Sequence, residues 1–66
     1  MPVITIELGA GQTSEAQKAE LIRRITADAV DISGIGIEKF TMFIRELPLE
    51  SIGVGGKTVK SLRAGQ

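Results

Sequence analysis

The chain opens on a segment in which large apolar side chains recur at every second position. In residues 2–8, one face of an extended chain carries Ile4, Ile6 and Leu8, and the other face carries Val3 with two polar residues. This period of two is typical of a β-strand with one face toward a core. We therefore expect a strand over residues 2–8, ended by the glycine-rich residues that follow.

The next segment has the periodicity of a helix. Ser14 and Gln17 have the spacing of a capping box, in which each side chain bonds the other residue's backbone N–H. Apolar residues then repeat every three or four positions within an arc of roughly 100°. The members of this apolar stripe are Leu21, Ile22, Ile25, Ala29 and Ile32. We expect the stripe to face the core and Ser33-Gly34 to end the helix.

A second alternating segment covers residues 39–46 and precedes Pro48, which cannot donate a hydrogen bond to a sheet. One face of this predicted strand carries Met42 and Ile44, and the other carries Phe43. Strand, long helix and strand form a β-α-β unit, whose crossover makes the two strands parallel. After this unit, residues 57–63 fit either a short strand or a helical turn.

One helix covers one face of a two-stranded sheet and leaves Val3 and Phe43 open on the other. Parallel sheets are normally buried on both faces. Hydrophobic residues make up 42% of only 66 residues, with no cysteine to supply a disulfide. We therefore expect an α/β (α+β) fold with a single domain over residues 1–66, in an obligate oligomer whose other copies cover the open face.

The composition argues against several partners. The chain has no histidine or cysteine to bind zinc, and eight basic residues balance eight acidic ones. Two phenylalanines are its only aromatic residues, too few for a base-stacking surface. No apolar run approaches the roughly 20 residues of a membrane span. We expect a soluble cytoplasmic protein with no metal, cofactor, nucleic-acid or membrane partner.

Residues 51–58, SIGVGGKT, differ at one position from the phosphate-binding loop G-x-x-x-x-G-K-[ST], because Ser51 replaces the first glycine. Such a loop joins a buried strand to a long helix whose N-terminus faces the phosphates. Few residues follow Thr58, and no later strand could supply an aspartate for magnesium. We expect a glycine turn between short extended segments instead of a nucleotide site.

Pro2 directly follows Met1, and removal of the methionine would expose a secondary amine. Partial burial or a neighbouring cation would lower the pKa of this amine toward neutrality. In a chain without histidine or cysteine, the amine is the best candidate for a general base near neutral pH. The alternative stays open that Pro2 only begins a strand, where proline is tolerated. With Met1 attached, its nitrogen is a tertiary amide and cannot act as a base.

The order of these features resembles the small tautomerases typified by 4-oxalocrotonate tautomerase, over almost the whole chain. The matching pieces are Met1-Pro2 at the start of a strand, Ala16-Gln17-Lys18 and Leu21-Ile22-Arg23 in the helix, Ile44-Arg45-Glu46 at the end of the second strand, Ile52–Gly56, and Ser61-Leu62-Arg63. The resemblance implies a β-α-β subunit with parallel strands and a short C-terminal hairpin, in a hexamer built as a trimer of dimers. It also implies a cofactor-independent isomerase that interconverts keto and enol forms of a small enol or 2-keto acid, with Pro2 as the base.

The resemblance further implies where substrate binds. A backbone amide near Leu8 lies where the family contacts substrate. Well-known members hold a dicarboxylate with two arginines, the first where this chain has Gln12 and Thr13 and the second where it has Thr41. Ile52 stands where those members have an aromatic residue, just before a glycine turn that packs on a neighbouring subunit. Arg45, on the same strand face as Thr41, could compensate in part, or it could form an ion pair that is exposed to solvent or lies between subunits.

Two alternatives to a tautomerase stay open. One is a hydratase or dehalogenase on the same scaffold, in which a protonated proline would act as an acid. The other is a non-catalytic structural subunit, alone or in a mixed hexamer, which the missing arginines would favour.

Overall fold

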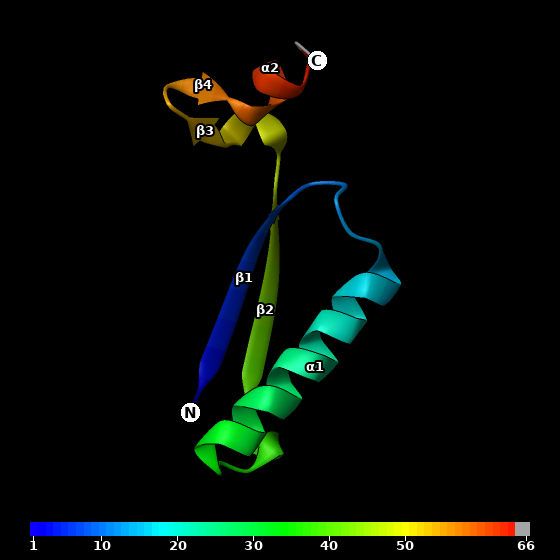
Figure 1. Ribbon diagram of the computed structural model, residues 1–66, viewed down its shortest axis with the longest axis vertical. Coiled ribbons are helices and arrows are strands. Elements are labelled where there is room, and N and C mark those ends of the chain that lie inside the picture. Colours follow the sequence, from blue (N-terminus) through cyan, green and yellow to red (C-terminus); the bar gives the residue numbers. More distant parts are fainter. Residues whose placement is uncertain (65–66) are drawn as a thin grey trace.

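The chain forms a β-α-β body and a C-terminal arm (Figure 1), and the computed structural model describes residues 1–64. Strands β1 (Val3–Gly9) and β2 (Thr41–Leu47) are parallel neighbours, in a register that pairs the first residue of each and the last residue of each. Helix α1 (Glu15–Ser33) connects them. The predicted pair of parallel strands joined by a long helix is confirmed.

Both predicted ends of α1 are also confirmed. Ser14 Oγ accepts a hydrogen bond from the Gln17 backbone N–H at 3.1 Å, and Gln17 Oε1 accepts from the Ser14 N–H at 2.8 Å. This reciprocal pair is the capping box. At the other end, Gly34 takes the left-handed conformation, with φ 73°, and its N–H donates to the carbonyl of Val30.

The strand boundaries differ from the prediction by one or two residues. Strand β2 starts at Thr41, not at residue 39, because Ile37–Lys39 forms a short 3-10 turn, η1. The strand ends at Leu47, directly before Pro48, as expected. Strand β1 starts after Pro2 and includes Gly9.

The prediction that the whole apolar stripe of α1 faces a core is wrong for two of its members. Leu21, Ile25 and Ala29 are half-buried, but Ile22 is 40% exposed and Ile32 is 86% exposed. The 19-residue helix is about 28 Å long, whereas each seven-residue strand spans about 23 Å. The last turn of α1 therefore extends past the sheet (Figure 1), and no segment within residues 1–64 covers Ile32.

The arm consists of η2 (Leu49–Ser51), β3 (Gly53–Val54), β4 (Lys57–Thr58) and α2 (Val59–Ala64). Strands β3 and β4 form an antiparallel hairpin whose two turn residues, Gly55 and Gly56, have φ values of 61° and 82°. Positive φ at both turn positions favours glycine there. The expected glycine turn and hairpin are confirmed, and residues 57–63 form both a short strand and a helical segment. The lysine of the motif lies in β4, so the loop does not lead directly into a helix.

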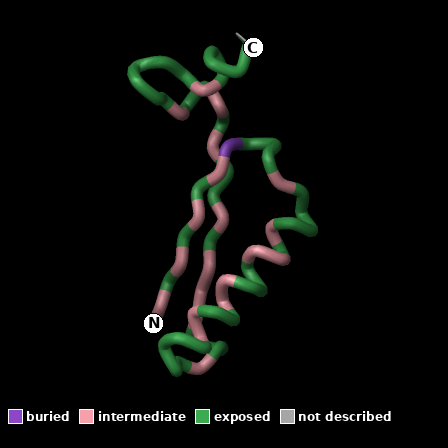
Figure 2. The backbone as a smooth tube through the Cα atoms, viewed as in Figure 1, coloured by how far each residue is buried: buried purple, intermediate pink, exposed green. Residues whose placement is uncertain are grey.

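The body and the arm together enclose no hydrophobic core. Among residues 1–64, no hydrophobic side chain is buried, and Figure 2 shows a single buried position, Gly9 at the end of β1. The radius of gyration is 15.2 Å, whereas about 11 Å is expected for a compact chain of this length. On the open face of the sheet, Val3 is 50% exposed and Phe43 is 54% exposed. The apolar surface that the sequence places on this face is thus uncovered in one copy of the chain.

Candidate active site

Pro2 lies immediately before β1 and is half-buried. Its carbonyl accepts a hydrogen bond of 3.1 Å from the backbone N–H of Thr41. Thr41 is the first residue of β2 and is also half-buried, so two of the predicted site residues are neighbours at one end of the sheet. The bond fixes the proline backbone to β2 and leaves its ring nitrogen outside the ladder.

Leu8 and Gln12 lie at the opposite end of β1. Six residues of extended chain separate Leu8 from Pro2, which corresponds to about 20 Å. Beyond the strand, the Gly9 N–H donates to Gln12 Oε1 at 3.2 Å, and the Ala10 N–H donates to the Leu47 carbonyl at 2.8 Å. The loop that carries Gln12 is therefore attached to both strands, far from Pro2 of the same chain.

Gly9 has a packing role that the sequence pattern does not predict. A Cβ atom built on it would lie 2.9 Å from Leu49 Cδ2 and 3.1 Å from Gln12 Cδ, closer than side chains normally approach. Gly9 thus allows Gln12 and Leu49 to pack on the strand end. Its place directly after the alternating segment predicts only that the strand ends there.

Arg45 does not approach Pro2 in this chain. It pairs in register with Glu7, and its Nη1 lies 4.0 Å from Glu7 Oε2, with the two side chains 63% and 57% exposed. An ion pair this long and this exposed contributes little stability. Four residues along β2 place Arg45 about 13 Å from Thr41. The contact favours the ion-pair interpretation of Arg45, although with a residue of the same chain.

Ile52 lies at the base of the arm, beyond the end of β2. It is half-buried, and its carbonyl accepts a 2.8 Å hydrogen bond from the Val59 N–H, which ties η2 to α2. Of the predicted site residues, only Thr41 lies beside Pro2 in one chain. Leu8, Gln12, Arg45 and Ile52 all lie toward the other end of the strands or past it.

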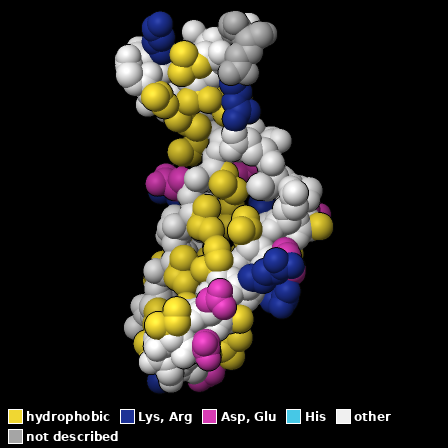
Figure 3. All heavy atoms as spheres, in the orientation of Figure 1, with side chains coloured by type: hydrophobic (Ala, Val, Ile, Leu, Met, Phe, Trp, Pro, Cys, Tyr) yellow, Lys and Arg dark blue, Asp and Glu magenta, His cyan; other side chains and the backbone are white. Residues whose placement is uncertain are grey.

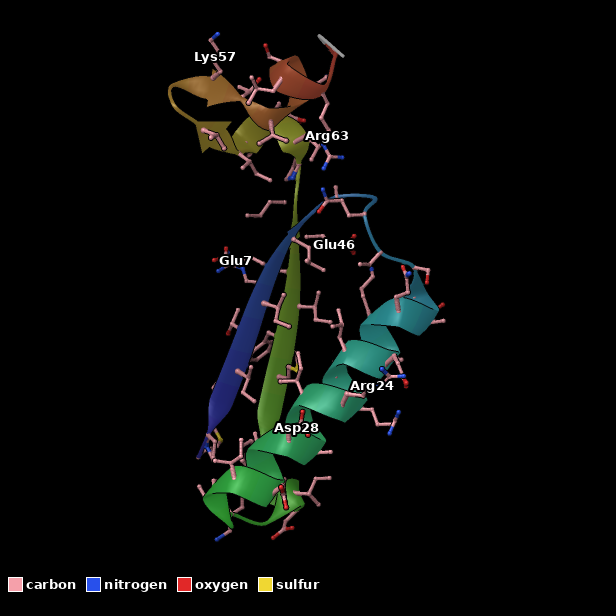
Figure 4. The ribbon with its side chains drawn as sticks, viewed as in Figure 1. Glu7, Arg24, Asp28, Glu46, Lys57 and Arg63 are labelled. Atoms are coloured by element: carbon pink, nitrogen blue, oxygen red, sulfur yellow. The ribbon has the colours of Figure 1, made fainter. Side chains whose placement is uncertain are left out.

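The charged side chains near Gln12 are paired. Lys18 on α1 binds Glu46 at the end of β2, and Figure 4 shows Glu46 on the side of the sheet that faces α1, with Glu7 on the other side. This bond, together with a hydrogen bond from the Gly11 backbone, holds the pKa of Glu46 below its ordinary value. On the outer surface of α1, Arg23 and Arg24 bind Glu20, each at 2.8 Å, and lower the pKa of Glu20.

A shallow groove of about 330 Å³ lies along the start of α1, between Thr13 and Arg24. Thr13 Oγ1 is buried there and has no hydrogen-bond partner within residues 1–64. The groove lies at the end of the body opposite Pro2, and it contains none of the predicted site residues. Within residues 1–64, no helix has the length and apolar character needed to cross a membrane.

Comparison with known proteins agrees with the fold. The family model described as tautomerase enzyme matches residues 2–62. The 2-hydroxymuconate tautomerase of Bacillus subtilis (strain 168) is 31% identical over 62 residues, which cover 94% of this chain and 98% of that protein.

Two solved structures extend the comparison to three dimensions. The heterohexamer 4-oxalocrotonate tautomerase of Chloroflexus aurantiacus J-10-fl superposes with a TM-score of 0.86 at 32% identity, covering 96% of this chain and 100% of that chain. A 4-oxalocrotonate tautomerase isozyme of Methylibium petroleiphilum gives a TM-score of 0.91 at 28% identity, covering 98% and 100%. The β-α-β body, the hairpin arm and the sequence match over nearly the whole chain together show that this chain belongs to the tautomerase family.

Proposed function

We propose that this protein is a cofactor-independent isomerase that interconverts the keto and enol forms of a small enol or 2-keto acid. Pro2 is its general base, after Met1 has been removed. The observation that carries the proposal is the position of Pro2, half-buried at the head of β1, where the match to the tautomerase family begins. The chain has no histidine or cysteine that could act as a base near neutral pH.

The proposed chemistry needs one amine. The secondary amine of Pro2 takes a proton from the enol hydroxyl, or from the carbon beside the carbonyl, and becomes positively charged. It then returns that proton to another carbon of the same substrate, so that a double bond moves and the base is regenerated. Half-burial favours the neutral amine over its charged form. The hydrogen bond from Thr41 to the Pro2 carbonyl holds the ring at the edge of the sheet.

We propose that neighbouring copies complete the site, in a homo-oligomer arranged as a hexamer of three dimers. The distance of about 20 Å along β1 prevents Leu8 and Gln12 from reaching Pro2 of their own chain. Figure 3 shows hydrophobic side chains exposed along the body and on the arm, and residues 1–64 bury none of them. The related Chloroflexus protein is a heterohexamer. Contact between copies would cover this surface and bring the Leu8 amide, Gln12, Arg45 or Ile52 of one copy toward Pro2 of another.

A second candidate is a structural subunit of a mixed hexamer. Gln12, Thr41 and Ile52 replace the arginines and the aromatic residue that the family resemblance leads one to expect, and one related structure is a heterohexamer. In that case the chain alone would be inactive, and a partner chain would carry the chemistry.

A third possibility is a hydratase or dehalogenase reaction on the same scaffold. It would use the protonated form of Pro2, so its rate would fall as the pH rises through the pKa of the amine.

The test is the ketonisation of 2-hydroxymuconate, followed by absorbance with chain that lacks Met1. We expect Pro2→Ala to lower kcat/KM at least about 100-fold, because a positioned general base contributes roughly 10²- to 10⁴-fold. Pro48→Ala, a change at the other proline, should leave the rate within about threefold. Equal rates for wild type and Pro2→Ala would refute the base, and a wild type at the background rate would refute the activity of the chain alone.

A further inference from the structure

Lys39 lies at the same end of the body as Pro2. Strands β1 and β2 both start there (Figure 1), and their parallel register pairs Val3 with Thr41. The Thr41 N–H donates to the Pro2 carbonyl at 3.1 Å, so Pro2 lies next to Phe40, whose backbone is extended with φ −85° and ψ 138°. Neighbouring strands lie about 4.8 Å apart and consecutive Cα atoms about 3.8 Å apart. The Cα atom of Lys39 is therefore at most about 9 Å from that of Pro2.

The turn η1 holds the backbone of Lys39 at the start of β2. The Lys39 N–H donates to the Gly36 carbonyl at 3.0 Å, and the Phe40 N–H donates to the Ile37 carbonyl at 3.2 Å. The neighbouring carboxylate of Glu38 lies against Gly36, since a Cβ on that glycine would overlap it. Lys39 is exposed, and within residues 1–64 it forms no ion pair with Glu38 or with any other carboxylate. Its ammonium group is thus available to a ligand.

The other cations of the body already have anionic partners. Each of them forms an ion pair with a glutamate of the same chain; they are Lys18, Arg23, Arg24 and Arg45. Arg45 is also about 13 Å along β2 from Thr41, the neighbour of Pro2. Lys39 is therefore the one cation of residues 1–47 that lies close to Pro2 and has no ion-pair partner within residues 1–64.

From this placement we infer that Lys39 binds the carboxylate of the substrate while Pro2 moves the proton. The inference rests on the proposed tautomerase function. In a small enol or 2-keto acid, the carboxylate is bonded to the carbon that carries the enol or keto oxygen, so it lies close to the atoms that lose and gain the proton. The lysine ammonium is a point charge on a flexible four-carbon stem, and it binds a carboxylate through charge-assisted hydrogen bonds. Lys39 thus orients the acid with its reacting atoms toward the Pro2 amine.

The test compares an acid with its ester in variants that change one charge. The probes are phenylenolpyruvate, which has a single carboxylate, and its methyl ester, in which that group is uncharged. Lys39→Gln removes the cation, and Lys39→Arg keeps it. Lys60→Gln is the matched control, because it removes the same charge at an exposed position of α2 with no ion pair within residues 1–64. All chains lack Met1 and are compared at equal oligomeric mass.

We expect Lys39→Gln to lower kcat/KM for the acid at least about tenfold, mainly through KM, because a hydrogen bond to a charged group is lost. Its kcat/KM for the ester should stay within about twofold of wild type, a difference that a merely structural role would not produce. Lys39→Arg should keep the acid within about threefold of wild type, and Lys60→Gln should change neither probe. Added salt should raise the KM of wild type for the acid more than that of Lys39→Gln.

Two results would overturn the inference and leave the proposed function intact. One is a Lys39→Gln variant that turns over the acid as well as wild type does. The other is an equal loss on acid and ester, which would make Lys39 a structural residue of η1. If Pro2→Ala were as active as wild type on both probes, or wild type ran at the background rate on both, the proposed function itself would fail, and the assignment of Lys39 would fail with it.

Discussion

Glu46 lies where three segments meet: the end of β2, the loop after β1 and the start of α1. Its carboxylate binds Lys18 and accepts a hydrogen bond from the Gly11 backbone, and both contacts lower its pKa from the ordinary value of 4.5. The two side chains of the ion pair are 29% and 33% exposed, so solvent weakens their interaction. The pair nevertheless fastens the loop that carries Gln12.

Because the pKa of Glu46 is lower in the folded chain than in the unfolded chain, its ionised form favours folding. This contribution is complete above the ordinary pKa of 4.5 and is lost as the pH falls through the lower folded-state value. We predict that Glu46→Gln lowers the urea midpoint slightly at pH 7 and loses less stability than wild type between about pH 5 and 3. Glu50→Gln, at an exposed carboxylate with no ion pair within residues 1–64, is the control. Parallel pH curves for wild type and Glu46→Gln would contradict the assignment.

At the scale of elements, hydrophobic periodicity was enough to predict both long strands, the helix and their parallel connection. The capping box and Gly34 predicted the two ends of the helix, because each cap depends only on hydrogen bonds and backbone conformation of residues close in sequence. The start of β2 was misplaced because a 3-10 turn over Ile37–Lys39 follows no apolar period. The exposure of Ile32 was missed because periodicity tells which side of a helix is apolar but not how far the sheet beneath it extends.

The candidate site was predictable only in part, because hydrophobic periodicity does not show how separate segments are placed in space. The sequence order suggested which residues matter, and the adjacency of Pro2 and Thr41 follows from the parallel register. The contact between Gly9 and Gln12 depends on how the chain turns after β1, and no sequence period encodes that turn. The separation of Gln12 and Ile52 from Pro2 became visible only once the strand directions were known.

The chain as a whole is extended, and residues 1–64 bury no hydrophobic side chain. We infer that contacts with further chains stabilise it, because a chain this short has few other sources of stability. We predict that Phe43→Glu, on the open sheet face, breaks the assembly, because burying an unpaired carboxylate there costs several kcal/mol. Size-exclusion chromatography with light scattering should give a multiple of the chain mass for wild type and the mass of a single chain for Phe43→Glu. Ala27→Glu, at an exposed position of α1, should keep the wild-type mass. A folded monomeric wild type would contradict the prediction.

We propose that the free secondary amine of Pro2 performs the chemistry, and this amine exists only in a chain that lacks Met1. A chain of 66 residues can be made by chemical synthesis both with and without Met1, with every other residue unchanged. The measurement is the initial rate of 2-hydroxymuconate ketonisation by the two products at equal concentration and equal oligomeric mass. We predict turnover by the chain that begins at Pro2 and only the background rate for the chain that retains Met1. Equal rates for the two chains would rule out Pro2 as the base, since the amide nitrogen of Met1-Pro2 cannot accept a proton.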